Sequence, residues 1–175
     1  DGANLEVLGK LMAIGTESSR IKFLSATGGD WGGIQFDDAS IDYSGSSGSI
    51  IKYSELSQSS SRVWEQILYV KNSNPLIDNN IINGYLRIDA QAEPARVTFT
   101  NNVHNGFIEL TAGESTSIGE IKLSGNTFYV TEFKEFRIYS GVPNTGTIEI
   151  SNNVYHSGYE GNIPDIYYLV HNIHD

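Results

Sequence analysis

The chain has 175 residues, of which 39% are hydrophobic and 18% charged, with a formal net charge of −10. This length fits one domain with a sizeable core, so we expect a single domain over residues 1–175. The excess of carboxylates argues against nucleic acid as a partner, no apolar run approaches the roughly 20 residues that span a bilayer, and the absence of cysteine excludes disulfides and thiolate metal sites.

The N-terminal part of the chain contains short strand patterns and no useful helical period. Apolar residues that alternate with polar ones, or that are β-branched, predict strands at Leu11–Ile14, Ile21–Phe23, Ile34–Phe36 and Ile51–Leu56. In the last of these segments the alternation directs Tyr53 toward the interior.

An acidic group follows the third of these strands and consists of Asp37, Asp38 and Asp42. The sequence predicts no cofactor, with Ca²⁺ at this group as the alternative, because clustered carboxylate oxygens bind hard cations. The same residues also suit a solvent-exposed turn, and no D-x-[DN]-x-[DN]-G loop accompanies them.

A repeat runs through the second half of the chain. Three segments share the order apolar, polar, apolar, hydroxyl, turn residue and Asn, and a fourth is a degenerate copy: Pro75–Asn80, Val97–Asn102, Ile121–Asn126 and Ile148–Asn153. Their final asparagines are separated by 22, 24 and 27 residues, a period that fits one turn of a solenoid. Further strands are predicted between the copies, at Gln66–Val70, Tyr85–Ile88, Phe107–Leu110 and Phe136–Tyr139.

The repeat predicts an all-β parallel solenoid of about six to seven coils, each of roughly 22–27 residues. The Asn-Asn and Gly-Asn pairs tolerate the left-handed conformation that a sharp bend needs. Equivalent residues of such a fold stack about 4.8 Å apart, so the side-chain amides of Asn80, Asn102, Asn126 and Asn153 are expected to form a ladder. In the preceding coil we expect Leu56 in place of the asparagine. An antiparallel sandwich is the alternative fold, but it does not explain the recurring asparagine.

Three stretches near the N-terminus, Gly9–Thr16, Ile21–Phe23 and Gly29–Phe36, resemble the opening coils of right-handed parallel β-helix proteins from bacterial and archaeal surfaces. The Asn-Asn turns resemble the same pectate-lyase-like superfamily, and the resemblance covers most of residues 4–156. It implies a right-handed parallel β-helix, an extracellular or cell-surface location, and a structural role for Trp31. The superfamily contains enzymes, adhesins and binding modules, so the resemblance does not choose among these functions.

Aromatic side chains are the strongest candidates for ligand contacts, because sugar rings stack on flat side chains. They are concentrated in the middle and C-terminal part of the chain: Trp64, Tyr129, Tyr139, Tyr155, Tyr159, Tyr167 and Tyr168. We therefore expect a non-catalytic module that binds a polysaccharide or another glycan, or that presents an adhesive face.

Two alternatives remain open. A lyase or hydrolase of acidic polysaccharide would need paired carboxylates, and Glu109 or Glu149 could meet a partner from an adjacent coil. A structural spacer or trimeric spike segment would need no ligand.

The two ends suggest that the chain belongs to a larger protein. It starts at Asp1 without a methionine, so we expect a processed or excised piece whose other partners are the flanking domains of its parent. Residues 157–175 contain Pro164 and little alternation, which predicts a C-terminal cap or tail over the open sheet edges.

Overall fold

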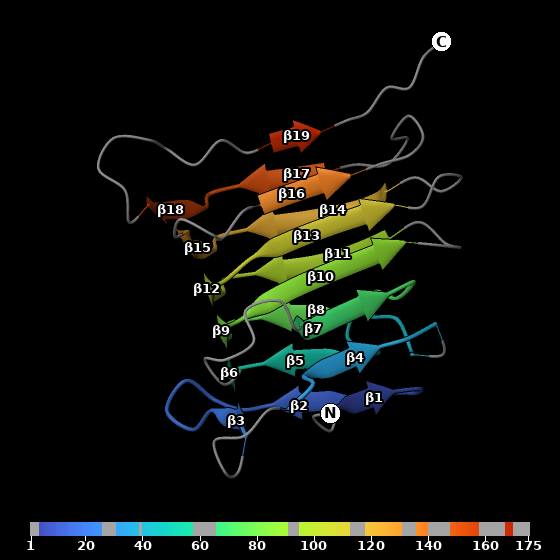
Figure 1. Ribbon diagram of the computed structural model, residues 1–175. Helices are drawn as coiled ribbons and strands as arrows, with labels where there is room; N and C mark the ends of the chain where they lie inside the picture. Colours follow the sequence, from blue (N-terminus) through green and yellow to red (C-terminus); the bar gives the residue numbers. More distant parts are fainter. Residues whose placement is uncertain are drawn as a thin grey trace.

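The computed structural model describes residues 4–25, 31–38, 40–57, 66–90, 95–112, 118–130, 136–139, 148–157 and 167–169. These residues form 19 strands and no α-helix (Figure 1). Within them, no helix is long and apolar enough to cross a membrane. The predicted cap at residues 157–175 lies almost wholly outside the described residues.

The strands form three parallel sheets. The first sheet contains β1 (Leu5–Val7), β4 (Ile34–Phe36), β7 (Gln66–Lys71), β10 (Tyr85–Ala90), β13 (Ile108–Ala112), β16 (Phe136–Tyr139) and β19 (Tyr167–Leu169). The second contains β2 (Met12–Ile14), β5 (Ile50–Lys52), β8 (Leu76–Asp78), β11 (Ala95–Thr100), β14 (Ile118–Ser124) and β17 (Ile148–Ser151). The third contains β3 (Ile21–Phe23), β6 (Ser54–Ser57), β9 (Ile81–Asn83), β12 (Val103–Asn105), β15 (Thr127–Val130) and β18 (Val154–Ser157).

Neighbouring strands within each sheet are three apart in chain order, so the chain visits the three sheets in turn (Figure 1). All the pairings recorded between named strands are parallel, for example β7 with β10 and β11 with β14. The antiparallel sandwich considered from the sequence is therefore wrong. The arrangement is compatible with a parallel β-helix, and the strands predicted between the repeats are confirmed to within about two residues at each end.

The core consists of apolar side chains that occupy equivalent register positions on successive strands. In the second sheet Ile51, Ile77, Phe99 and Leu123 stack in one inward column and are each 0% exposed. In the third sheet the corresponding inward column includes the buried His104, whose ring makes edge contacts with those of Phe99 and Phe128 at centroid distances of 6.2 Å to each. Stacking one side chain on the equivalent one of the next strand buries the apolar faces continuously along the molecule.

The corner between the second and third sheets is where the repeated asparagines lie. The residue just before each of them has a positive φ: 58° at Asn79, 55° at Asn101, 69° at Gly125 and 55° at Asn152. Asn and Gly adopt this left-handed conformation at least cost, which explains the Asn-Asn and Gly-Asn pairs.

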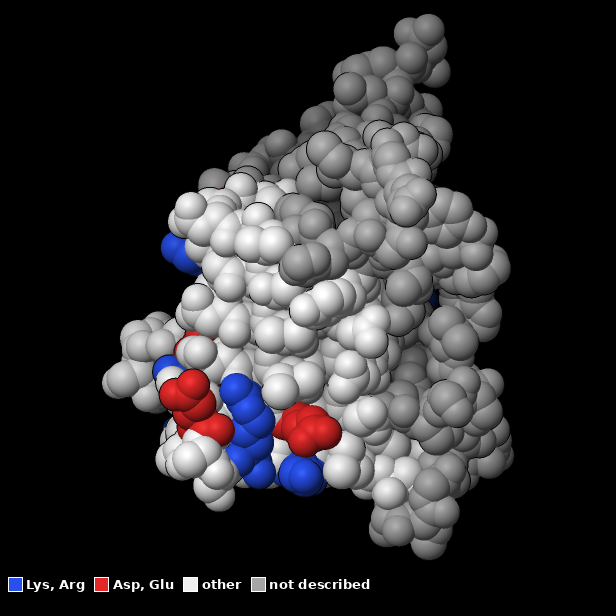
Figure 2. Space-filling view, turned by 90° about the vertical axis from the view of Figure 1, so that its left-hand side faces the viewer, with Lys and Arg blue, Asp and Glu red and all other residues white. Residues whose placement is uncertain are grey.

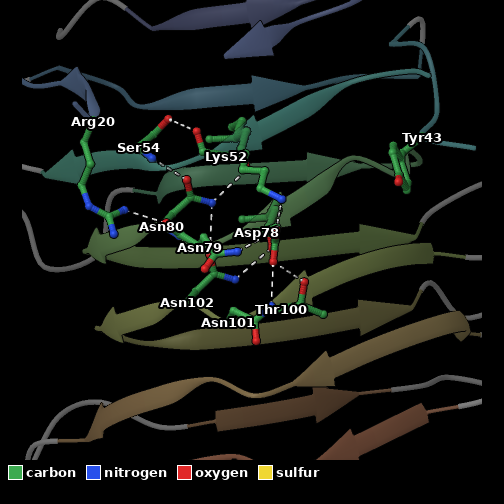
Figure 3. Close-up of polar contacts among 12 residues, drawn as sticks. Arg20, Tyr43, Lys52, Ser54, Asp78, Asn79, Asn80, Thr100, Asn101 and Asn102 are labelled. Atoms are coloured by element: carbon green, nitrogen blue, oxygen red, sulfur yellow. Dashed lines mark hydrogen bonds and ion pairs between the residues drawn. The ribbon is translucent and has the colours of Figure 1, made fainter. Parts of the chain in front are cut away.

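The repeated asparagines join neighbouring strands through their side chains, as Figure 3 shows for Asn80 and Asn102. The Nδ2 atoms of Asn80, Asn102 and Asn126 donate to the Oδ1 atoms of Asn102, Asn126 and Asn153, at 3.0, 3.2 and 3.0 Å. Each of these oxygens also accepts a hydrogen bond from the backbone N–H of the previous asparagine, at 2.8–2.9 Å. The buried amides are thus paired along the sheet direction.

Two expectations for the turn between β5 and β6, one step before the turn at Asn80, are wrong. The position that corresponds to Asn80 is Ser54, whose backbone N–H donates to Asn80 Oδ1 at 2.8 Å, while Leu56 pairs with the core residue Ile82. Tyr53 does not point into the core. It stands at the corner with a φ of 49°, and the cationic groups of Arg20 and Lys52 lie 5.9 and 5.3 Å from its ring centroid. The bend between β5 and β6 interrupts the alternation that the sequence suggested.

Candidate functional site

The outer face of the first sheet carries charged and aromatic side chains on its central strands. Along β10, Tyr85, Arg87 and Asp89 alternate with Leu86 and Ile88, which belong to the buried core. Because side chains of a strand alternate between its two faces, the three polar residues lie on the outer face. In register, Arg87 pairs with Tyr69 of β7 and with Glu109 of β13.

These five residues, Tyr69, Tyr85, Arg87, Asp89 and Glu109, form one connected group that we call the outer cluster. The carboxylate of Asp89 accepts hydrogen bonds from the Tyr69 hydroxyl at 3.3 Å and from Arg87 Nη2 at 3.1 Å. The guanidinium of Arg87 lies 5.8 Å from the centroid of the Tyr69 ring. The Tyr85 hydroxyl donates to Glu109 Oε2. Ion pairing, hydrogen bonding and a cation–π contact thus fix the geometry of the cluster.

A β-bulge shapes one side of the cluster. Tyr85 pairs with Gln66 but Leu86 pairs with Leu68, so β7 contains one extra residue at Ile67. Bulges bend a strand and change the direction of nearby side chains. Tyr85 is only 6% exposed, and its ring makes an edge contact with Phe107 at a centroid distance of 5.0 Å.

Both phenols of the cluster stay protonated at neutral pH. Burial raises the pKa of Tyr69, and the neighbouring Asp89 carboxylate raises it further. Burial and the hydrogen bond to Glu109 raise the pKa of Tyr85 well above its ordinary value. Tyr69 and Tyr85 therefore act as hydrogen-bond donors to the two carboxylates.

Two polar atoms of this face are buried and have no hydrogen-bond partner: Arg87 Nε and Thr111 Oγ1. Thr111 pairs in register with Asp89, so both atoms belong to neighbouring outer positions. A buried donor without a partner costs about 1–3 kcal/mol, which a bound polar group would recover.

A polar pocket of about 310 Å³ lies at the ends of β4 and β7 and is lined by Asp38, Asp42, Asn72, Asn74 and Arg96, with the hydroxyls of Ser40 and Ser73. Lys71 connects it to the outer cluster. The Lys71 backbone pairs with Asp89, and its Nζ lies 3.1 Å from Asp37 Oδ1 and 3.7 Å from Asp38 Oδ1.

The three aspartates considered for Ca²⁺ contact cationic and N–H groups. The backbone N–H of Asp38 and the ammonium of Lys71 lower the pKa of Asp37. Asp42 Oδ1 accepts the backbone N–H of Asn74 at 2.7 Å. Among the described residues, no three carboxylate, imidazole or thiol side chains come together to hold a metal ion. The geometry gives no support to the calcium site, which stays a prediction.

The predicted sugar-binding aromatics fall into three groups. Trp64 and Tyr159 lie outside the described residues. Tyr139, Tyr155, Tyr167 and Tyr168 are placed by their backbones only, and the register pairs Tyr139 with Thr111 and Tyr167 with Arg137. Tyr155 pairs with the buried Phe128. The register thus brings Tyr139 and Tyr167 to positions that continue the outer columns of Asp89 and Arg87.

Tyr129 is 43% exposed and lies on the outer face of the third sheet. One outer column of this face starts with the Lys22–Glu55 pair and continues with Ile81, Val103, Thr127 and Val154, which are uncharged. Figure 2 shows that charged side chains gather mainly at the lower end of this face, over the N-terminal strands. The upper described part provides apolar and stacking contacts without a charged hydrogen-bonding group in this column.

A second buried aspartate, Asp78, is held differently (Figure 3). Its Oδ1 accepts from Thr100 Oγ1 at 2.8 Å and Asn101 Nδ2 at 2.9 Å, and its Oδ2 accepts from Asn79 Nδ2 and Lys52 Nζ, both at 2.8 Å. Burial raises the pKa of Asp78, but these hydrogen bonds lower it more, so the net pKa lies below the ordinary value. The four donors come from the fold itself, which indicates a structural site.

The sequence interpretation missed the outer cluster, although a signal was present. The strand at Tyr85–Ile88 was predicted, and its alternation already places Tyr85 and Arg87 opposite the apolar face. The contacts with Tyr69 and Glu109 depend on the register of three strands, which one sequence does not reveal.

Comparison of the chain with protein-family models, with curated proteins and with solved structures found no match in any of the three. Function therefore rests on the geometry of the site.

Proposed function

We propose that the three sheets form a right-handed parallel β-helix, a solenoid of about six to seven coils with one strand per sheet in each coil. The regular order of the strands supports this, as do the hydrogen bonds that link asparagines 22, 24 and 27 residues apart. Right-handedness is the rule for crossovers between parallel strands, in about 98% of cases. A crystal structure tests both points, and left-handed crossovers would contradict the assignment.

We further propose that this module binds a glycan on the outer face of the first sheet, without catalysing its cleavage, as part of a larger secreted or cell-surface protein. The outer cluster is the observation that carries this function. Sugars are recognised by planar side chains that stack and by charged groups that exchange hydrogen bonds with hydroxyls. The cluster combines both kinds of group on one face of the first sheet.

The positions of Tyr139 and Tyr167 support the proposal that the glycan binds on the outer face of the first sheet. Both were expected to contact sugar, and the backbone register places them in columns that run through Thr111 and Arg137. Parallel strands repeat about every 4.8 Å, so successive residues of these columns can contact successive parts of an extended ligand.

Retention on insoluble polysaccharides and binding to a glycan array test this proposal. We expect retention by the intact chain and weaker retention by Tyr139→Ala. Tyr129→Ala is the matched control, because it removes an exposed tyrosine from the third sheet instead. The reverse order of effects would move the site to the third sheet and contradict the proposal.

The proposal that the module does not cleave its ligand needs a separate measurement. Each retained polysaccharide is incubated with the protein, with and without Ca²⁺, and its products are followed by reducing ends and by the ultraviolet absorbance of unsaturated sugars. Unchanged polymer is expected. Release of either product would establish the lyase or hydrolase alternative.

A further inference from the structure

The outer cluster has no surplus of positive charge. Its described side chains comprise one guanidinium, from Arg87, and two carboxylates, from Asp89 and Glu109. The charge of Arg87 is already compensated by the Asp89 carboxylate, which is 2% exposed. A ligand carboxylate would therefore meet two fixed carboxylates in a chain of net charge −10.

The unpartnered atoms argue against a cationic ligand. The N–H of Arg87 Nε is a buried donor without an acceptor. An ammonium group offers only donors, so it cannot satisfy this atom. A hydroxyl accepts from Nε–H and at the same time donates to a neighbouring oxygen, and it carries no charge.

The second unpartnered atom, Thr111 Oγ1, requires a hydrogen-bonding group of the ligand on the neighbouring strand as well. Thr111 lies on β13, opposite Asp89 and diagonal to Arg87. Diagonal positions on neighbouring strands are about 7–8 Å apart. The hydroxyls around the rim of one sugar ring can reach from one side chain toward the other.

We propose that the ligand of the outer cluster is an uncharged glycan, with sugar hydroxyls that accept from Arg87 Nε and bond to Thr111 Oγ1. This inference rests on the proposed glycan-binding function and names the class of glycan. Acidic polysaccharides are poor ligands because their carboxylates are repelled by Asp89 and Glu109.

The test uses pairs of polymers that differ only in charge. Each acidic polysaccharide, including polygalacturonate, is compared with the same polymer after chemical reduction of its carboxylates to primary alcohols. A panel of natural neutral polysaccharides is measured beside them. We expect retention on neutral polymers and at least about tenfold weaker retention on the acidic member of a retained pair.

Two variants locate the site. Thr111→Val replaces the hydroxyl by a methyl group and is expected to weaken retention on neutral glycan about five- to tenfold, the effect of one lost hydrogen bond. Arg87→Lys keeps the charge but removes Nε–H and the Nη2 hydrogen bond to Asp89, so it is expected to weaken retention at least as much. Thr127→Val, the same change on the outer face of the third sheet, is the control and should leave retention unchanged.

The outcomes separate the two proposals. Stronger retention on an acidic polymer than on its reduced counterpart overturns the neutral-glycan inference and leaves glycan binding in place. Retention of no polymer overturns both. If binding occurs but a folded Thr111→Val binds as well as the parent, the outer cluster is not the site; thermal melts of each variant establish that it is folded.

Discussion

Two buried aspartates, Asp78 and Asp89, lie in contrasting surroundings. Asp78 stands at the corner between the second and third sheets, 7% exposed, and accepts hydrogen bonds from Lys52, Asn79, Thr100 and Asn101. Asp89 stands on the outer face of the first sheet, next to two buried polar atoms without partners, Arg87 Nε and Thr111 Oγ1. Burial of a carboxylate alone therefore does not identify a function. Unsatisfied neighbours point to a ligand, and a complete set of donors points to a structural role.

The largest effect should come from removing the Asp78 carboxylate. Asp78→Ala leaves Lys52 and three further donors without their acceptor, so we expect the free energy of unfolding in urea to fall by about 3–5 kcal/mol. Glycan retention per folded molecule should be unchanged. Asp38→Ala, at a carboxylate whose side chain is 57% exposed, is the control and should cost much less. Equal losses at both positions would refute the structural role of Asp78.

Disruption of the asparagine ladder should have the next largest effect on stability. Asn102 is 1% exposed, and its amide accepts from Asn80 while donating to Ile77 O and Asn126 Oδ1. Asn102→Ala leaves these buried groups without hydrogen-bond partners and should lower the free energy of unfolding by about 2–4 kcal/mol. Asn83→Ala, on the outer side of the third sheet, is the matched control for urea denaturation. A loss below that of the control would show that the ladder adds no stability.

The strands could be predicted from short-range alternation, and the ladder from a motif that recurs at intervals of 22, 24 and 27 residues. Alternation such as Val97-Thr98-Phe99 marks a strand, and the recurring asparagine marks a corner. The register of the earlier turn could not be predicted. Ser54 occupies the ladder position there, but it lacks the side-chain amide of asparagine, so the sequence pattern predicts Leu56 at this position instead.

The outer cluster was missed for a different reason. Tyr69, Arg87 and Glu109 are separated by 18 and 22 residues, and the bulge beside Tyr85 shifts the pairing by one residue. A one-residue shift changes which side chains meet on a face, and neither composition nor spacing reports it. Predicting which side chains meet across strands requires the strand register, whereas predicting the strands themselves does not.

The same comparison predicts a pH dependence. The pKa of Asp78 in the folded protein lies below the value of 3.8 for a free carboxyl. The stabilisation it provides is therefore complete above that value and is lost as the pH falls through the folded pKa. The urea midpoint should decrease from about pH 5 to about pH 3, and Asp78→Asn should decrease less over this range. Asp37 and Glu149 also have lowered pKa values, so part of the decrease should persist. An identical decrease in both proteins would contradict the assignment to Asp78.

The smallest effect should come from Lys71, which connects the outer cluster with the polar pocket. Its ammonium pairs with Asp37 at the surface, where solvent and salt screen the interaction, so Lys71→Gln should not measurably change the thermal midpoint. The pKa of Asp37 should nevertheless rise, as measured by NMR titration of the carboxyl carbon. It should stay below its ordinary value, because the largest cause of the lowered pKa is the backbone N–H of Asp38, which the substitution leaves in place. A return to the ordinary value would show that Lys71 alone holds this carboxylate, and a strong dependence of glycan retention on Lys71 would extend the binding face from the outer cluster into the pocket.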